Sequence, residues 1–92
     1  MKEKTLEVEL DVTQKDIDRG VAGDPWECPL ARAFNRAVKK RKCEVGDSIG
    51  IGDVSYITPS KLLKFIKSFD NYERVNVKPF KAILNLKEIP QP

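Results

Sequence analysis

Histidine is absent from this sequence, and cysteine, methionine and tryptophan are rare, with two, one and one residues among 92. Histidine is the side chain that ordinarily changes charge near neutral pH, so its absence excludes His-based acid–base catalysis and His-containing metal sites. Two isolated cysteines are too few for a zinc site within one chain. The sequence therefore predicts no metal, no cofactor and no enzymatic activity.

Long apolar runs are missing as well. Charged residues make up 34% of the chain and hydrophobic residues 40%, and no apolar stretch approaches the length of about 20 residues that spans a membrane. The first residues lead directly into an alternating pattern, without the apolar segment of a signal peptide. We expect one domain covering residues 1–92, with a frayed tail at 88–92, in the cytoplasm and with no membrane partner.

A helix with one apolar and one basic face is the best-defined element. Its apolar residues recur at the spacing of one buried helical stripe, and they are Leu30, Ala33, Phe34, Ala37 and Val38. Pro29 suits a first helical turn, with Cys28 at the cap. Asp24 followed by Glu27 allows a start one turn earlier. Both starts stay open.

The two cysteines lie at opposite ends of this helix. Its rise of about 1.5 Å per residue would hold Cys28 and Cys43 roughly 20 Å apart, beyond the reach of a disulfide. We therefore expect two free thiols, as in a reducing compartment. The helix dipole could make Cys28 reactive, but no histidine is present to act as its base, so we favour a capping role.

Two further elements are predicted before the helix. Residues 5–12 alternate as a half-buried strand with an acidic outer face. Thr13 and Asp16 have the spacing of a capping box that begins a short helix. Gly20 is expected to end that helix in a left-handed conformation.

The second half of the chain predicts strands around another helix. Residues 44–57 read as two strands with a turn at Gly52-Asp53. Thr58 is expected to cap a helix with Pro59 in its first turn. This helix turns Leu62, Leu63, Phe65, Ile66 and Phe69 toward the core and ends at Asp70-Asn71. Residues 75–77 form a short extended piece, and residues 80–86 alternate as a last strand.

These elements follow the order β-α-α-β-β-α-β. The order predicts an α+β fold, a small single domain with a mostly antiparallel sheet of three or four strands and two main helices packed on one face. The first and last strands are candidate neighbours.

Charge is distributed unevenly along the chain, although the net charge is only +3. Residues 1–31 hold four basic and eight acidic side chains, whereas residues 32–42 hold six basic and no acidic ones. Such a chain favours a basic binding face or self-association through opposite charges. A solvated helix face is the simpler interpretation.

The candidate ligand-binding residues are Trp26, Arg32, Arg36, Lys39, Lys40 and Tyr56. Arg32 and Arg36 lie one helical turn apart and would form a fork for phosphate, which the two lysines extend. Trp26 and Tyr56 are candidate platforms for a nucleobase. Trp26 could equally cover the core.

Four short patches carry a resemblance to a known group of proteins. They are Asp18-Arg-Gly20, Cys28-Pro-Leu-Ala-Arg-Ala33, Phe69-Asp70 and Val77-Lys-Pro-Phe80. Together they resemble short proteins of unknown function that are encoded by tailed bacteriophages and prophages. The resemblance implies a phage accessory protein in the host cell cytoplasm, and it carries over no catalytic residues.

Two functions follow as hypotheses. The first is a non-enzymatic phage accessory protein, with an anti-defence role, that captures a phosphate-bearing, nucleotide-like ligand in a site between the subunits of a homo-oligomer. The second is a binder or inhibitor of a host macromolecule, either nucleic acid or protein, that uses the same basic face extended by Lys61, Lys64 and Lys67.

Overall fold

The computed structural model describes residues 4–39, 43–71 and 77–90, and they form the mixed α+β fold that the sequence predicts. The described elements are β1 (Thr5–Val12), α1 (Gln14–Arg19), α2 (Pro29–Val38), β2 (Cys43–Val45), β3 (Ser48–Ile51), β4 (Val54–Ile57), α3 (Ser60–Asp70) and β5 (Phe80–Lys87). Among them, no helix has both the length and the apolar character that crossing a membrane would require.

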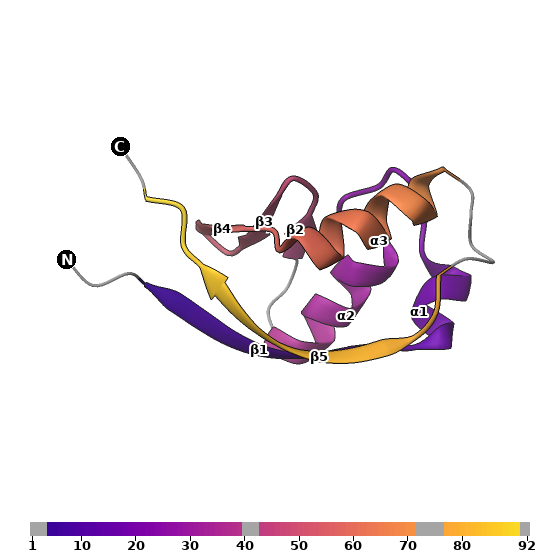
Figure 1. Ribbon diagram of the computed structural model, residues 1–92, viewed down its shortest axis with the longest axis horizontal. Coiled ribbons are helices and arrows are strands. Elements are labelled where there is room, and N and C mark those ends of the chain that lie inside the picture. Colours follow the sequence, from indigo (N-terminus) through magenta and orange to yellow (C-terminus); the bar gives the residue numbers. More distant parts are fainter. Residues whose placement is uncertain (1–3, 40–42, 72–76, 91–92) are drawn as a thin grey trace.

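The two longest strands, β1 and β5, form a curved antiparallel ribbon along one side of the molecule (Figure 1). Thr5 pairs with Lys87 at one end and Val12 with Phe80 at the other. Successive strand residues face opposite sides, so alternate apolar side chains of both strands turn inward. The charged residues turn outward, and so does Ile83 of β5, which is 70% exposed. The expectation that the first and last strands are neighbours is therefore confirmed.

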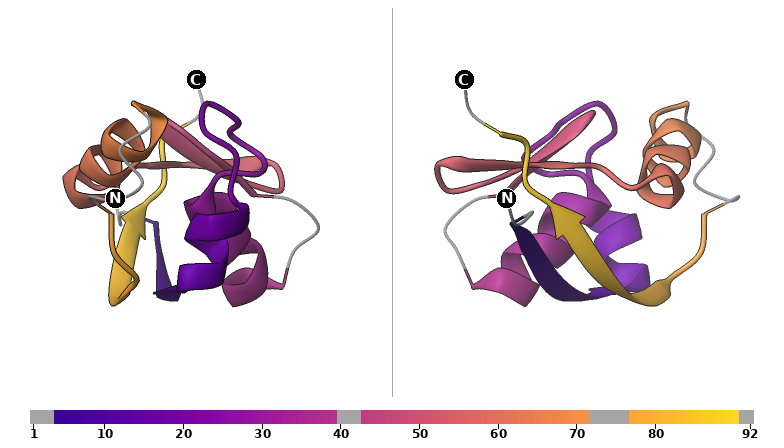
Figure 2. Two further views of the ribbon diagram at one scale, coloured as in Figure 1. Left: turned by 90° about the vertical axis from the view of Figure 1, so that its right-hand side faces the viewer. Right: turned by 60° about the vertical axis from the view of Figure 1, so that its left-hand side comes forward.

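Both long helices lie over the inner face of this ribbon (Figure 1). Viewed along the ribbon, α3 lies on one side together with β5, whereas α1 and α2 lie on the other side with β1 (Figure 2). The predicted packing of two main helices on one face is thus observed. The basic residues of α2 and those of α3, however, lie on different sides of the molecule.

A second antiparallel sheet, with the strand order β2-β3-β4, covers one end of the fold. The turn predicted at Gly52-Asp53 joins β3 to β4, and Gly52 has a φ of 63°, which favours glycine. The expectation of two strands in this segment is wrong. Residues Cys43–Val45 pair separately with β3, because the chain also reverses at Gly46, whose N–H donates to the Ser48 carbonyl.

Leu30 and Phe34 of α2 are fully buried, as predicted, and belong to the same core as Leu62 and Phe69 of α3. On each helix, one residue of the predicted apolar stripe is exposed instead of buried. Ala37 is exposed because the last turn of α2 faces an open groove, and Leu63 is 38% exposed because it faces another groove beside α3.

The helix starts agree with the sequence for α1 and α2. Thr13 and Asp16 form the complete capping box. Cys28 caps α2, with the Ala31 N–H donating to its Sγ at 3.4 Å. The earlier start at Asp24 does not occur. Its carboxylate instead accepts the Trp26 N–H at 2.9 Å and closes a turn before the helix.

The predicted cap of α3 is wrong. The Thr58 hydroxyl donates to the Gly46 carbonyl at 2.8 Å, so it joins α3 to the β2–β3 turn. Pro59 occupies the cap position and makes no side-chain hydrogen bond there. The prediction of fraying is wrong for Glu88 and Ile89, whose N–H groups donate to Lys4 and Ser55 carbonyls. The predicted extended piece at 75–77 lies outside the described residues except for Val77, which is buried.

Gly20 ends α1 in an extended conformation, with φ −69° and ψ 152°, so the left-handed ending is wrong. A glycine fits this position because of a close approach. A Cβ atom here would lie 2.6 Å from Cγ and Cδ of Pro29 and 2.8 Å from the Asp16 carbonyl oxygen. The residue allows the start of α2 to pack directly against the end of α1.

Gly20→Ala is therefore expected to lower the free energy of unfolding by about 1–3 kcal/mol, because the added methyl group overpacks this contact. Gly46→Ala is the matched control, since a Cβ at Gly46 would meet no atom within 4 Å. Urea unfolding followed by circular dichroism measures both. Equal stability of the two variants would contradict the close packing.

Candidate functional site

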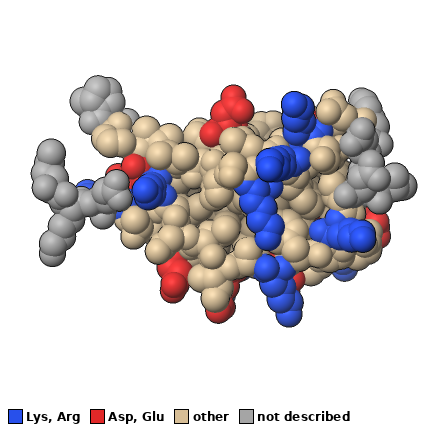
Figure 3. All heavy atoms as spheres, viewed as in Figure 1, with Lys and Arg blue, Asp and Glu red and all other residues tan. Residues whose placement is uncertain are grey.

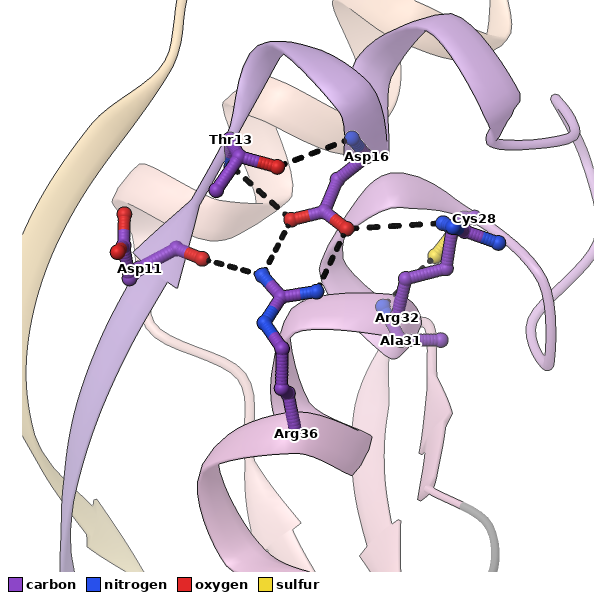
Figure 4. A network of polar contacts seen from close by, with 7 residues as sticks. All are labelled: Asp11, Thr13, Asp16, Cys28, Ala31, Arg32 and Arg36. Atoms are coloured by element: carbon purple, nitrogen blue, oxygen red, sulfur yellow. Dashed lines mark hydrogen bonds and ion pairs between the residues drawn. The ribbon is translucent and has the colours of Figure 1, made fainter.

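Arg36 holds a buried carboxylate rather than facing solvent alone (Figure 4). Its Nη1 donates to Asp16 Oδ1 at 2.9 Å, and its Nη2 donates to Asp16 Oδ2 at 2.6 Å. The same Nη2 donates to the Asp11 carbonyl oxygen at 2.8 Å. The Asp16 side chain is 1% exposed, whereas the Arg36 side chain is 51% exposed. The guanidinium thus joins α2 to α1 and to the end of β1.

The Asp16 carboxylate has further polar neighbours. Oδ2 accepts the Thr13 N–H at 2.9 Å, and Arg32 Nε lies 3.6 Å from Oδ1. Burial raises the pKa of Asp16, but the hydrogen bonds from Arg36 and Thr13, together with the Arg36 charge, outweigh it and hold the pKa below its usual value. The group therefore stays ionised, and the ion pair is part of the fold.

In this arrangement the two arginines predicted to bind phosphate already face a carboxylate of the same chain. Arg32 and Arg36 are brought together as expected, but both point toward Asp16. Arg36 is therefore more than part of a solvated helix face, because its guanidinium makes hydrogen bonds within the fold. The sequence indicated Asp16 only as a cap, and no local signal connects it with a residue 20 positions away.

The other predicted ligand-binding residues do not gather around this pair. Tyr56 is only 9% exposed and belongs to the core, where its strand bridges to Glu88. Trp26 is 43% exposed, in the turn before α2. Lys39 is exposed at the C-terminal end of α2, and Lys40 lies outside the described residues.

A separate basic surface runs over α3 and the residues just before β5. Its residues, named here the lysine face, are exposed, and they are Lys61, Lys64 and Lys67 of α3 and Lys78, which precedes β5. Figure 3 shows basic side chains gathered over these elements. Lys61 Nζ lies 5.0 Å from the centre of the Phe80 ring, which ties the two elements together. Between Ser60 and Lys87 the sequence has seven basic and two acidic residues. The expectation that the α3 lysines extend the basic face of α2 is wrong, because the two helices lie on different sides of the ribbon.

Carboxylates line three grooves on the described surface. One, of about 500 Å³, lies between α3, residues 23–28 and the β2–β3 turn, and it contains Asp24, Asp47 and Asp70. Glu7 and Glu9 line the groove beside α2, and Glu9 and Asp11 line the one on the ribbon. None of these grooves is an obvious site for a small phosphate ligand.

Two of the resembling patches meet at the first of these grooves. Cys28 and Asp70 both line it. Asp70 Oδ1 also accepts the Gly23 N–H at 2.9 Å, so the end of α3 holds the loop that leads into α2. This bond gives Asp70 a structural role beside any role in binding.

Both cysteines are free and buried, which confirms the predicted absence of a disulfide. Burial raises the pKa of the Cys28 and Cys43 thiols. A raised pKa disfavours the nucleophilic thiolate, so the geometry supports the capping role of Cys28. Within the described ranges, no cluster of three potential ligands is placed to hold a metal ion.

Comparison with known proteins gives no assignment. No protein-family model matches the chain, and neither a curated protein nor a solved structure matches it. Function must therefore be inferred from the chemistry and geometry of the residues themselves.

Proposed function

We propose that this protein is a non-enzymatic binding protein that holds nucleic acid on the lysine face. One observation carries the proposal. Four exposed lysines, three on α3 and one just before β5, belong to the surface where Figure 3 shows basic side chains gathered. Lysine ammonium groups contact the phosphate backbone without reading the bases, so we expect binding with little sequence preference.

The lysine face replaces the α2 face as the preferred anion site. Arg32 and Arg36 already contact the buried Asp16 carboxylate, and a phosphate would have to compete with it. The lysines of α3 have no such buried acid among their described contacts. Lys61, Lys64 and Lys67 follow one another at intervals of three residues, which gives a row of charge about 9 Å long. A row of this kind suits a polymer of phosphates better than a single small ligand.

A polymer of phosphates can bind to an open surface, so the proposed function does not require a basic pocket. The phosphate-bearing small molecule of the first hypothesis would require an enclosed site, but the grooves carry acidic side chains. The second hypothesis, a host macromolecule as the partner, is therefore the better supported. The open face also needs no second subunit to complete it, so the proposal does not depend on a homo-oligomer.

The phage accessory role and the anti-defence role belong to the same proposal. They rest on the resembling patches, and they would make host nucleic acid in the host cytoplasm the natural target. The net charge of +3 is low for a dedicated nucleic-acid-binding domain. Because the charge is concentrated on one side, we expect moderate affinity, in the range of about 10⁻⁴–10⁻⁶ M at physiological salt.

The triple variant Lys61→Ala/Lys64→Ala/Lys67→Ala is expected to bind a fluorescently labelled DNA duplex at least about tenfold more weakly than the wild type. The slope of log affinity against log salt concentration should fall by about three units, because each lost phosphate contact removes about one. Fluorescence anisotropy over a series of salt concentrations measures both quantities.

A triple variant with the same charge change provides the control. Figure 2 shows that α1 and α2 lie on the other side of the molecule from α3, and Lys15 and Arg19 of α1 and Lys39 at the end of α2 are exposed. Their replacement by alanine should change the affinity by less than about twofold if the α3 lysines make the contacts. Equal losses in the two triple variants, or no binding by the wild type at low salt, would contradict the proposed function.

A further inference from the structure

The groove beside α3 combines an apolar floor with an acidic rim. Its volume is about 500 Å³, and it lies between α3, the loop before α2 and the β2–β3 turn. The apolar side chains that line it are Pro25, Cys28, Val45, Leu63 and Ile66, and the charged ones are Asp24, Asp47, Lys67 and Asp70. The groove lining thus contains three carboxylates and one ammonium group.

One side of α3 faces this groove rather than the core. Leu63, Ile66, Lys67 and Asp70 recur at intervals of three and four residues, so they form one stripe of the helix. Leu62 and Phe69 form the buried side of the same helix. Leu63 remains 38% exposed, and Ile66 is half-buried. The helix therefore offers more apolar surface than the described fold covers.

The frame of the groove is held by several hydrogen bonds. The Gly23 N–H donates to Asp70, the Val45 N–H donates to the Pro25 carbonyl at 2.9 Å, and the Thr58 hydroxyl donates to the Gly46 carbonyl. These bonds connect the loop, β2 and the segment that enters α3. The groove is therefore a formed feature of the fold, and a ligand would not need to order its walls.

We propose that this groove binds a peptide segment of a partner protein in which an apolar side chain stands next to an arginine or lysine. The apolar side chain packs on Leu63 and Ile66. The neighbouring cation faces the carboxylates of the rim, with Asp47 the most accessible of them because it lies on an exposed turn. Charge complementarity selects this partner, because an acidic segment or a phosphate would meet three carboxylates. This second site shares Lys67 with the lysine face, and its other lining residues lie outside that face.

The test uses the full chain labelled with ¹⁵N and two short capped peptides. One peptide alternates leucine with arginine, and the other alternates leucine with glutamate. The arginine peptide is expected to shift the amide signals of Gly23 and Gly46, which line the groove, and to leave that of Gly52 in place. The glutamate peptide is expected to shift none of them. Equal shifts with both peptides, or no shift of Gly23 and Gly46 with the arginine peptide, would overturn the proposal.

Two charge reversals on exposed turns of the same sheet make the test specific. Asp47→Lys is expected to weaken binding of the arginine peptide at least about tenfold, which corresponds to the loss of a close charge pair. Asp53→Lys introduces the same change on the β3–β4 turn, away from the groove, and should leave the affinity within about twofold. Equal weakening by both variants would show a general charge effect and overturn the assignment. A concentration-dependent shift of Gly23 and Gly46 without peptide would instead identify a second copy as the occupant and overturn it as well.

Discussion

Arg36→Ala is expected to lower the free energy of unfolding by about 2–4 kcal/mol, because it leaves the buried Asp16 carboxylate without its bidentate partner. The range lies below the loss for a fully buried ion pair, since Arg36 is half exposed and Arg32 Nε remains 3.6 Å from the carboxylate. Arg36→Lys should recover only part of the loss, since an ammonium group cannot donate in the same fork geometry. Urea unfolding followed by far-ultraviolet circular dichroism measures these values.

A double variant separates the charge effect from the loss of packing. In Asp16→Asn/Arg36→Ala the uncompensated charge is gone, while the amide can still accept hydrogen bonds from Thr13. We therefore expect this double variant to be more stable than the sum of its two single variants predicts. Lys64→Ala removes a positive charge from an exposed helix face and should change stability by less than about 0.5 kcal/mol. A loss for Arg36→Ala no larger than that for Lys64→Ala would contradict the structural role of the ion pair.

Phe34→Ala is expected to have the largest effect on stability, a loss of about 3–5 kcal/mol. Phe34 is 0% exposed and, with Phe69, is one of the two largest fully buried side chains among the described residues, so its removal leaves a cavity that the surrounding core cannot fill completely. Domains of this kind have total stabilities of about 5–15 kcal/mol, so the variant should melt at a much lower temperature. Differential scanning calorimetry measures the change.

Phe65→Ala is the matched control for this prediction. Phe65 lies on α3, is only half-buried and packs against the rings of Phe69 and Phe80. The same substitution there removes less buried surface, so the loss of stability should be clearly smaller. A change of only a degree or two in the melting temperature of Phe34→Ala would mean that the assigned register of α2 is wrong.

The parts of the fold that sequence could predict are those that depend on neighbouring residues. The spacing of Leu30 and Phe34 defines the buried side of α2, and Pro29 after Cys28 defines its start. The alternation in residues 5–12 and 80–86 defines which side of each strand is inside. These features need only helical or strand geometry, and they are confirmed.

The errors concern residues whose roles depend on a distant segment. Gly20 follows a short helix, as a left-handed glycine would, but its role comes from the approach of Pro29. Thr58 precedes a helix, as a cap would, but its hydroxyl reaches the Gly46 carbonyl. Local sequence is the same in both interpretations, so only the three-dimensional arrangement decides between them.

The same reason explains the partial success at the candidate site. Sequence correctly placed Arg32 and Arg36 on one side of a helix, but it gave no sign that Asp16 lies opposite them. It also joined the basic residues of α2 and α3, because nothing in the sequence showed that the two helices lie on different sides of the ribbon. The sequence therefore indicated that the α3 lysines are part of a basic surface, but it did not show where on the molecule that surface lies.

The pairing of β1 with β5 has a consequence for synthesis of the chain. β1 is synthesised well before its strand partner β5, because almost the whole described chain separates the two. Until then, the inner residues of β1 can pack only against elements that precede β5, of which α1 and α2 follow β1 directly. Closing such a long loop comes late in folding, and contacts of high sequence separation slow it. We infer that α1, α2 and the β2–β4 sheet form first and that the ribbon closes last.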